Sequence, residues 1–283
     1  MHIVVCIKQV PDSAQIRVHP VTNTIMRQGV PTIINPYDLF ALEAALRLRD
    51  LHGGKITVLT MGPPMAEESL RRALSFGPDR AVLLTDRSFA GSDTLATSYA
   101  LSETIRKIGE HFGPVDVVFT GKQTIDGDTA QVGPGIAKRL NLNQLTYVAA
   151  VRELNLEAGS ITVERRAEGG VQVLSTKLPC LITMLEGTNE IRRGSIEVAL
   201  NAARAEIVIW SAAAAGIADT GKCGLKGSPT VVKRVFAPKP RSEKAFQIDP
   251  AGLAPDAVAA SAMAEIFKRL PSLEKELTQQ AQG

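Results

Sequence analysis

The chain has 283 residues, of which 45% are hydrophobic and 22% charged, and this usage is typical of a globular protein with one large domain or one domain plus a smaller module. A net charge of +3 without a block of Lys or Arg, and only 4% aromatic residues, argue against a nucleic-acid surface. Cys6, Cys180 and Cys223 lie far apart without a CxxC spacing, so we expect no thiolate metal site and a reducing compartment.

The first residues, MHIVVCIKQVP, form a short apolar run without a signal-peptide cleavage pattern. No stretch reaches the roughly 18 to 20 apolar residues that a membrane-spanning helix needs. We therefore expect a cytoplasmic protein without a membrane span.

Four continuous apolar runs, rich in β-branched residues, predict strands that are buried on both faces, as in a parallel sheet. They are residues 2–8, 55–61, 80–85 and 115–120. Segments with apolar residues at helical spacing alternate with them, at residues 37–51, 65–76, 94–108 and 132–140. This alternation predicts the α/β class with a doubly wound, mostly parallel sheet.

Other segments interrupt this pattern. Residues 17–19 and 24–27 predict a hairpin. After residue 140, short strands separated by turns predict antiparallel additions to the sheet, at residues 148–154, 160–166, 171–177 and 180–185.

The last part of the chain has the pattern of an arm. Residues 187–204 predict a polar loop that leads into a weak helix, and residues 237–250 predict an extended linker. A helix follows over residues 253–277, and Pro271 is expected to interrupt it. One helix cannot form its own core, so we expect residues 1–236 to form the α/β domain and residues 237–283 to form an arm that docks elsewhere.

Small, polar and glycine residues gather where the predicted strands end, and ligands of open α/β sheets bind outside the carboxyl ends of the strands. The richest of these segments, residues 121–134, reads GKQTIDGDTAQVGP. Gly127 and Gly133 permit a close approach of backbone to a ligand. Asp128 and Gln131 resemble a capping box, which would begin a helix there; alternatively, Pro134 is the first helical residue.

In either case, free N–H groups at a helix start favour an anion such as a pyrophosphate. Thr129 and Gln131 can add neutral hydrogen bonds, whereas Asp126 and Asp128 would repel phosphate and are assigned capping or ribose-hydroxyl roles. A capped surface helix without a ligand is an equally good interpretation of this segment. Asn35, before Pro36, similarly predicts the N-cap of a helix, with or without a role in binding.

We find no catalytic constellation and expect no catalytic residue. His2, His19, His52 and His111 are scattered without a nucleophile or carboxylate partner nearby. Neither a GxGxxG fingerprint nor a GxxxxGK[ST] phosphate loop is present. The sequence therefore favours a protein that holds a cofactor over a hydrolase or a transferase.

Several motifs resemble those of the β subunit of electron-transfer flavoproteins. They are VCIKQVPD from Val5, NPYD from Asn35, MGP from Met61, GKQTIDGDTAQVGP from Gly121, LPC from Leu178 and KGSPT from Lys226. They occur in the family's order and cover nearly the whole chain. The resemblance implies a doubly wound fold of the adenine nucleotide alpha-hydrolase type.

The resemblance also implies a heterodimer, in which a larger α subunit holds one FAD and the β subunit holds an adenine nucleotide. In one branch this nucleotide is a structural AMP. In the other, which includes nitrogen-fixation-linked proteins, it is a second FAD that supports electron bifurcation from NADH. GDTAQVG from Gly127 and DTLATS from Asp93 resemble the second branch, so we expect FAD over AMP.

The family's nucleotide site maps onto the strand ends described above. The implied cofactor-binding residues are Ile7, Lys8, Asn35, Asp38, Thr60, Met61, Gly62, Thr94, Thr97, Gly121, Asp126, Gly127, Asp128, Thr129, Ala130, Gln131, Val132 and Gly133. A loop at about residues 188–200 corresponds to the family's docking loop for acyl-CoA dehydrogenases or other flavin dehydrogenases, with Ile196 as its apolar anchor. The C-terminal arm corresponds to the segment that wraps the α subunit.

The resemblance thus implies electron transfer from NADH or a flavin dehydrogenase, with ferredoxin or flavodoxin among the acceptors in the bifurcating case. Within the family, the alternative is a non-bifurcating subunit with structural AMP. From other classes, the alternatives are a free-standing nucleotide-binding module of the stress-response type and an adenylate-forming enzyme. The C-terminal arm argues against the first of these, and the missing phosphate loop argues against the second.

Overall fold

The computed structural model describes residues 1–12, 31–233, 247–273 and 277. The chain divides into two compact units, Met1–Phe236 and Ala237–Gly283, and each is described by itself. The hairpin predicted within residues 17–27 lies outside the described residues.

The first unit is built on a nine-stranded sheet in the order β11-β5-β4-β1-β6-β10-β7-β8-β9. Its strands are β1 (His2–Cys6), β4 (Lys55–Met61), β5 (Arg80–Leu84), β6 (Val117–Gly121), β7 (Asn143–Asn155), β8 (Ser160–Ala167), β9 (Gly170–Lys177), β10 (Cys180–Met184) and β11 (Val208–Trp210). Neighbours from β11 to β7 pair parallel, and β8 and β9 add antiparallel strands to the end of the sheet. The predicted α/β class and doubly wound sheet are confirmed.

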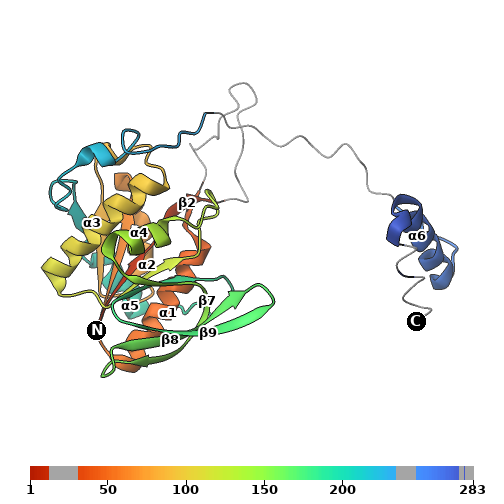
Figure 1. Ribbon diagram of the computed structural model, residues 1–283, viewed down its shortest axis with the longest axis horizontal. Coiled ribbons are helices and arrows are strands. Elements are labelled where there is room, and N and C mark those ends of the chain that lie inside the picture. Colours follow the sequence, from red (N-terminus) through yellow and green to blue (C-terminus); the bar gives the residue numbers. More distant parts are fainter. Residues whose placement is uncertain (13–30, 234–246, 274–276, 278–283) are drawn as a thin grey trace. The chain divides into compact units, whose positions relative to one another are not determined.

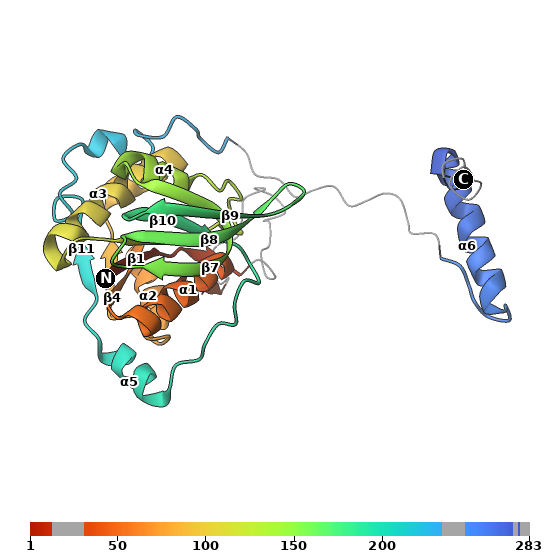
Figure 2. The same cartoon turned by 60° about the horizontal axis from the view of Figure 1, so that its bottom comes forward.

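Helices cover both faces of this sheet (Figures 1 and 2). They are α1 (Pro36–His52), α2 (Glu67–Leu74), α3 (Thr94–Phe112) and α4 (Val132–Leu140). The first unit also contains α5 (Ile196–Arg204), which lies against α2, and the short 3-10 turns η2 (Pro64–Ala66), η3 (Arg87–Phe89) and η4 (Thr220–Lys222). α1 and α2 pack on one face of the sheet, and α3 and α4 pack on the other.

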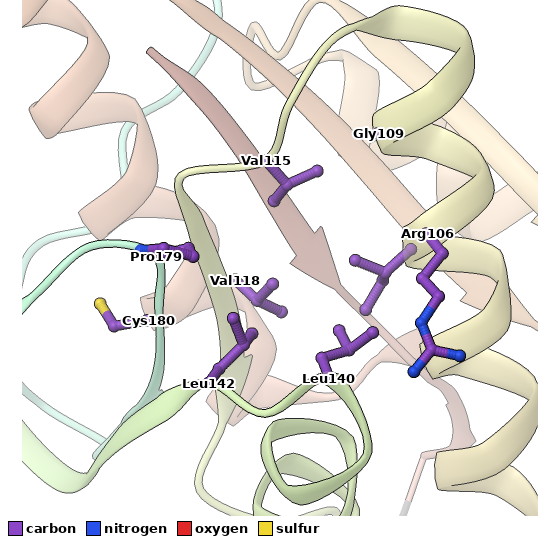
Figure 3. A pocket seen from close by; sticks show the side chains of 9 residues that line it. Arg106, Gly109, Val115, Val118, Leu140, Leu142, Pro179 and Cys180 are labelled. Atoms are coloured by element: carbon purple, nitrogen blue, oxygen red, sulfur yellow. The ribbon is translucent and has the colours of Figure 1, made fainter.

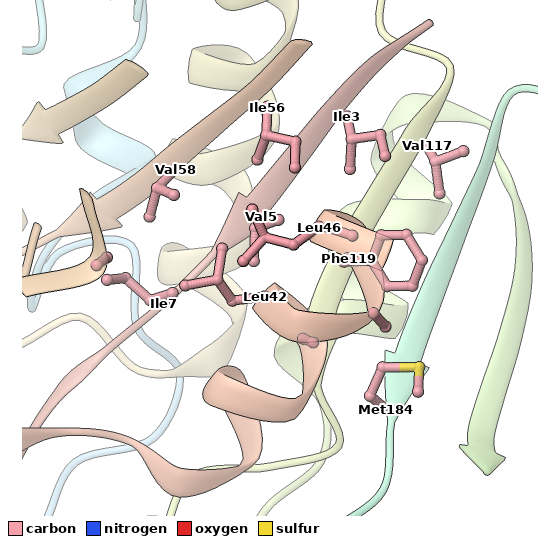
Figure 4. Close-up of a cluster of buried hydrophobic side chains, with 14 of the residues drawn as sticks. Ile3, Val5, Ile7, Leu42, Leu46, Ile56, Val58, Val117, Phe119 and Met184 are labelled. Atoms are coloured by element: carbon pink, nitrogen blue, oxygen red, sulfur yellow. The ribbon is translucent and has the colours of Figure 1, made fainter. Parts of the chain in front are cut away.

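The apolar runs form central strands because both of their faces are buried. Along β1, Ile3 and Val5 pack into the core under α1 and α2, whereas Val4 and Cys6 pack into the core under α3 and α4. Figure 4 shows the first of these cores, where Leu42 and other α1 side chains meet the strands. A polar residue at any position of such a strand would face a core. These runs therefore lack the alternation of apolar and polar residues that is typical of a strand with one exposed face.

The end of the predicted strand series requires a correction. β10 is not part of the antiparallel addition, because Cys180 pairs parallel with Val117 of β6 and with Asn143 of β7. The chain leaves the parallel sheet at β7, forms the antiparallel β8 and β9, and returns to fill the gap between β6 and β7. Strand order depends on long-range pairing, which local apolar patterns do not encode.

The segment after residue 205 contributes one strand and several buried side chains to the first unit. β11 extends the sheet beside β5, with Trp210 opposite Leu84. Ile217 and Cys223, which follow in the Gly- and Pro-containing stretch, are buried in the core under α3. Isolated apolar residues between turns thus complete the edge of a core that other elements supply.

A second, two-stranded sheet lies where β1 leads toward α1. β2 (Gln9–Pro11) pairs antiparallel with β3 (Thr32–Ile34). This pairing places Asn35 next to the end of β1, and the Asn35 N–H donates to the Lys8 carbonyl at 2.9 Å. The first turn of α1 is thereby fixed beside the carboxyl end of the sheet.

The second unit contains α6 (Pro255–Arg269), which begins with proline and has Leu270 as its C-cap, immediately before Pro271. The predicted interruption at Pro271 is thus confirmed. None of the residues of α6 is buried within the chain. Among the helices of the described residues, none is long and apolar enough to cross a membrane.

Candidate nucleotide-binding site

Asp38 joins two neighbouring strand ends. Its carboxylate is buried and accepts the Lys8 N–H at 2.8 Å and the Gly121 N–H at 3.1 Å. Burial raises the pKa of Asp38 to about 7, although the hydrogen bonds from Asn35 and from these two N–H groups oppose the shift. Asp38 therefore fixes the backbone at the ends of β1 and β6, and both of its oxygens are engaged within the protein.

Asn35 holds the loop that follows β6. It occupies the N-cap position of α1, as predicted, but its side chain makes no capping hydrogen bond. Instead, the fully buried amide donates to the Gln123 carbonyl at 2.8 Å and accepts from the Ile125 N–H at 3.2 Å. The N-cap position thus serves to anchor a loop from a distant part of the chain.

The two aspartates of this loop are paired within the protein. Both oxygens of Asp126 lie 2.7 Å from Lys8 Nζ, and the Asp128 Oδ1 accepts from Gln123 Nε2 at 2.7 Å. Burial opposes ionisation of Asp126, but the hydrogen bond from Lys8 holds its pKa below the ordinary value. The repulsion that these carboxylates would exert on a phosphate is thereby reduced.

Backbone conformation makes the loop unusual. Asp128 and Ala130 have φ values of 52° and 54°, in the left-handed region that non-glycine residues rarely adopt. Loops with such φ reversals are typical of the concave runs of N–H groups that bind anions. Strain of this kind persists where the surrounding structure fixes it, and here Gln123 fixes Asp128.

The start of α4 differs from both predicted alternatives. The helix begins at Val132, between the capping-box start at Asp128 and the proline start at Pro134, and Gln131 is its N-cap without a capping side chain. The Gly135 N–H makes the first intrahelical bond, to the Gln131 carbonyl at 2.9 Å. The N–H groups of Val132 and Gly133 precede that bond, so they have no partner within the helix and favour an anion.

Two glycines allow the backbone segments to approach one another closely at this edge. A Cβ on Gly121 would lie 2.5 Å from Asp38 Oδ1 and 2.6 Å from Tyr37 Cβ. A Cβ on Gly133 would lie 2.9 Å from both Thr120 Oγ1 and Thr183 Cγ2. No larger residue fits at either position, so α1 and α4 rest directly on the strand ends.

The starts of α3 and α4 are joined by a side-chain hydrogen bond. Thr94 Oγ1 donates to Gln131 Oε1 at 2.8 Å. Beside it, Asp93 caps α3 by accepting from the N–H groups of Leu95 and Ala96, and its other oxygen accepts from Thr230. The two motifs that begin at Asp93 and at Gly127 therefore meet at one place, although more than 30 residues separate them.

Hydrogen bonds and close contacts join most of the predicted site residues at this edge. Thr60 Oγ1, for example, donates to the Ile7 carbonyl at 2.8 Å, and a Cβ on Gly62 would lie 2.9 Å from Ala66. Thr97 stands apart as a helical residue, since its N–H donates to the Asp93 carbonyl within α3. Met61, Gly127, Thr129, Ala130 and Val132 lie on the same strand end, loop and helix start without a direct side-chain link to the others.

Ile196, the predicted docking anchor, lies at a different place from the residues of this edge. It is the first residue of α5, and the segment before it is held by Glu43 and Asp50, away from the first turn of α1 where Asn35 and Asp38 lie. Its side chain is 82% exposed.

Sequence reasoning missed some residues of the site. Gln123 lies inside the quoted motif, yet its pairing with Asp128 carried no local signal. Lys122 Nζ lies 5.5 Å from the ring centroids of both Tyr37 and Tyr147. Tyr147 has φ of 58° beside a register shift in β7, and no sequence pattern marks this irregularity.

The hollow drawn in Figure 3 lies at the other end of the strands. Its lining includes Val115 and Val118 around the start of β6 and Pro179 and Cys180 at the start of β10, and its volume is about 200 Å³. Apolar side chains dominate it and the phosphate-favouring N–H groups are absent from its lining, so it does not compete with the carboxyl edge as the nucleotide site.

The carboxyl edge combines neutral hydrogen-bond donors, close backbone approach at glycines and a helix N-terminus, which are features that favour an anionic ligand. Comparison with known proteins identifies the family. The electron transfer flavoprotein domain matches residues 22–215. Over 283 residues, the chain is 74% identical to Protein FixA of Azorhizobium caulinodans, and all of both chains is covered.

Similarity extends to more distant relatives. The chain is 65% identical over 281 residues to Protein FixA of Azotobacter vinelandii, covering 99% of this chain and 100% of that one. It is 48% identical over 249 residues to electron transfer flavoprotein subunit beta of Thermoanaerobacterium thermosaccharolyticum, covering 88% and 92% of the two chains. The chain therefore belongs to the electron transfer flavoprotein family, as a protein of the beta-subunit type. Such subunits pair with an alpha subunit.

Proposed function

We propose that the chain binds FAD at the carboxyl edge of its sheet and transfers electrons as the β subunit of a heterodimeric electron transfer flavoprotein. The observation that carries this proposal is the contact between Thr94 and Gln131, at 2.8 Å. It brings together the two motifs, DTLATS and GDTAQVG, that resemble the FAD-binding branch of the family. With family membership established, the free-standing stress-type module and the adenylate-forming enzyme are set aside.

The residues at this edge fit such a nucleotide. The N–H groups of Val132 and Gly133 would hold the pyrophosphate, because they are the unpaired donors at a helix start. Gly121 and Gly133 let α1 and α4 pack directly on the strand ends and bring the start of α4 to this edge. Asp126 is already paired with Lys8, so a bound phosphate meets a neutralised carboxylate.

When bound, a flavin supplies the chemistry of accepting two electrons from NADH and releasing them singly. The residues of this chain bind and orient it, and no side chain of the site is required as an acid or a base. Under this proposal, one electron goes to a high-potential acceptor and the other to ferredoxin or flavodoxin, which is bifurcation. Ile196 would dock an acyl-CoA dehydrogenase or another flavin dehydrogenase, and α6 would dock on the α subunit.

The test is to co-express the chain with its α subunit, purify the heterodimer, denature it and count FAD and AMP per heterodimer. Two FAD and no AMP are expected, and NADH should then reduce two acceptors of different potential in equal amounts. One FAD and one AMP would refute both FAD binding in this chain and bifurcation. That result would make the chain a subunit of a simple electron carrier.

A further inference from the structure

Residues 189–205, here called the docking segment, comprise the loop before α5, the helix itself and Ala205. Its loop is held along one face of α1. The Asn189 side chain donates to the Phe40 carbonyl at 3.0 Å, and Arg47 donates to the Glu190 carbonyl at 3.2 Å. The residues on α1 are spaced at helical intervals, so a single face of this helix receives the whole loop.

Glu43 is the centre of this attachment. Its side chain is only 3% exposed, and it accepts from Arg192 three times: from Nε at 2.8 Å, from Nη2 at 3.1 Å and from the backbone N–H at 3.2 Å. The Arg192 Nη1 also donates to Asp50 at 2.6 Å. Burial opposes ionisation of Glu43, but the hydrogen bonds from Arg192 and Arg47 keep its pKa below the ordinary value.

A second guanidinium holds the other end of the docking segment. Arg71 of α2 donates to the carbonyls of Ala202, Ala203 and Ala205 at 3.1, 2.9 and 3.3 Å. These are the carbonyls at the C-terminus of α5, where a positive charge is favoured. Between the two ends, a Cβ on Gly194 would lie 1.9 Å from the Ser75 carbonyl oxygen, so the backbone rests directly on the body of the domain.

This arrangement determines which face of α5 is presented. Val198 and Ala202 face inward, and Ala202 is buried. Ile196 and Leu200 lie one turn apart on the other face and are 82% and 53% exposed. The helix is short and has little buried surface of its own, so propensity and packing alone do not fix its orientation.

We propose that Glu43 and Arg71 are positioning residues for partner docking: they clamp the two ends of the docking segment so that Ile196 and Leu200 form a preorganised apolar anchor for a flavin dehydrogenase. This inference rests on the proposed function. A planar guanidinium that engages a carboxylate through two nitrogens fixes direction as well as distance, which a lysine does not. A segment ordered before binding loses less conformational entropy on association, so the clamps act on affinity and not on electron transfer itself.

The experiment uses the purified heterodimer with an acyl-CoA dehydrogenase, reduced by its acyl-CoA, as the protein electron donor and a small dye as a second acceptor. The variants are Glu43→Gln, Arg192→Lys, the combination of these two substitutions, and Arg71→Gln. Arg72→Gln is the matched control for Arg71→Gln, because it removes the same charge from an exposed neighbour on α2 that lies outside the docking segment and forms no ion pair within the described residues. Arg192→Lys keeps the buried Glu43 paired with a cation, so it guards against a variant that fails to fold.

Glu43→Gln and Arg71→Gln should each raise KM for the dehydrogenase about tenfold, with kcat and dye reduction unchanged, because only preorganisation is lost. Arg72→Gln should behave like the wild type. In the double variant, which combines Glu43→Gln with Arg192→Lys, the rise in KM should be smaller than the product of the rises in the two single variants. The reason is that Glu43 and Arg192 act as one unit.

An unchanged KM in Glu43→Gln, or a parallel loss of kcat and dye reduction, would overturn the inference. If the wild-type heterodimer holds its cofactors but accepts electrons from no flavin dehydrogenase, the proposed partner is refuted instead, and the clamps then have no docking role. The two failures are therefore distinguishable.

Discussion

At the scale of single residues, the site depends both on glycines, which lack a side chain, and on buried polar side chains. Gly121 and Gly133 lie where any side chain would collide with a neighbouring element. Asp38 acts through its side chain instead: its buried carboxylate accepts N–H groups at the ends of two strands and holds these ends together. These residues shape the backbone around the proposed nucleotide.

Gly121→Ala should lower the free energy of unfolding by about 1–3 kcal/mol, because the new methyl group overpacks the contact with Asp38 and Tyr37. Nucleotide retained by the heterodimer should fall with it. Urea denaturation and a nucleotide count measure the two effects. Gly109→Ala is the control: its Cβ would lie 3.8 Å from Val115, and it should stabilise α3 by about 1 kcal/mol. Equal behaviour of the two variants would contradict the close approach at Gly121.

Asp38 should make the stability of the chain depend on pH. Its pKa is raised from 3.8 to about 7 in the folded protein, so the native state binds more protons than the unfolded state between these values. The contribution is therefore fully present below pH 3.8 and is lost as the pH rises through about 7.

Asp38→Asn should remove this part of the pH dependence. Unfolding by urea at several pH values from 5 to about 8, in both proteins, measures the difference in slope. The wild type should lose stability relative to the variant as the pH rises. A constant difference between the two proteins would show that Asp38 does not titrate in this window.

At the scale of elements, the first turns of α1 and α4 make the contacts that bring distant segments together. α1 begins beside β1 because β2 and β3 bring it there, and Asn35 at its N-cap then holds the loop after β6. α4 begins on the ends of β6 and β10, where Gly133 leaves room for the contact. Elements that are distant in sequence thus meet at one edge.

Asn35→Ala should release the loop after β6. It leaves the Ile125 N–H and the Gln123 carbonyl without their buried partner, at an expected cost of about 1–3 kcal/mol in the free energy of unfolding. Proteolysis within residues 124–131 should become faster than in the wild type. Asn143→Ala, at an exposed site with one long contact to the Lys177 carbonyl, is the control. A loop that stays resistant in Asn35→Ala would show that Asn35 does not hold it.

At the scale of the whole molecule, the two units differ in how much of their described residues is buried. Met1–Phe236 contains the cores on both faces of the sheet, whereas the described helix of Ala237–Gly283 has no buried residue. Met263, Ile266 and Leu270 of this second unit are exposed within the chain. We therefore expect their apolar face to be covered by the α subunit.

Ile266→Asp combined with Leu270→Asp should abolish co-purification with the α subunit, because two charges would be buried in that interface. Thermal unfolding of the full chain alone should not change, since both side chains are exposed in the described part of the second unit. Ser261→Asp, an exposed position of α6 that lies on a different face of the helix from Ile266, should keep the partner. Normal assembly of the double variant would refute the docking role of α6.

The sequence alone determined the class of fold, the four central strands and the edge at which polar residues gather. It could do so because strands buried on both faces need continuous apolar runs, and because carboxyl ends of parallel strands meet at one edge. Its motifs also identified the family, and the comparisons confirm that membership. These signals are local in the sequence, or are contained in motifs that can be matched one by one.

Only the tertiary structure decided how distant segments pair. It placed β10 inside the parallel sheet, moved the start of α4 to Val132, and turned Asn35 from a cap into a loop anchor. It also joined Glu43 to Arg192 across 149 positions of the chain. Pairings of this kind depend on which elements become neighbours after folding, and neither periodicity nor local propensity records that information.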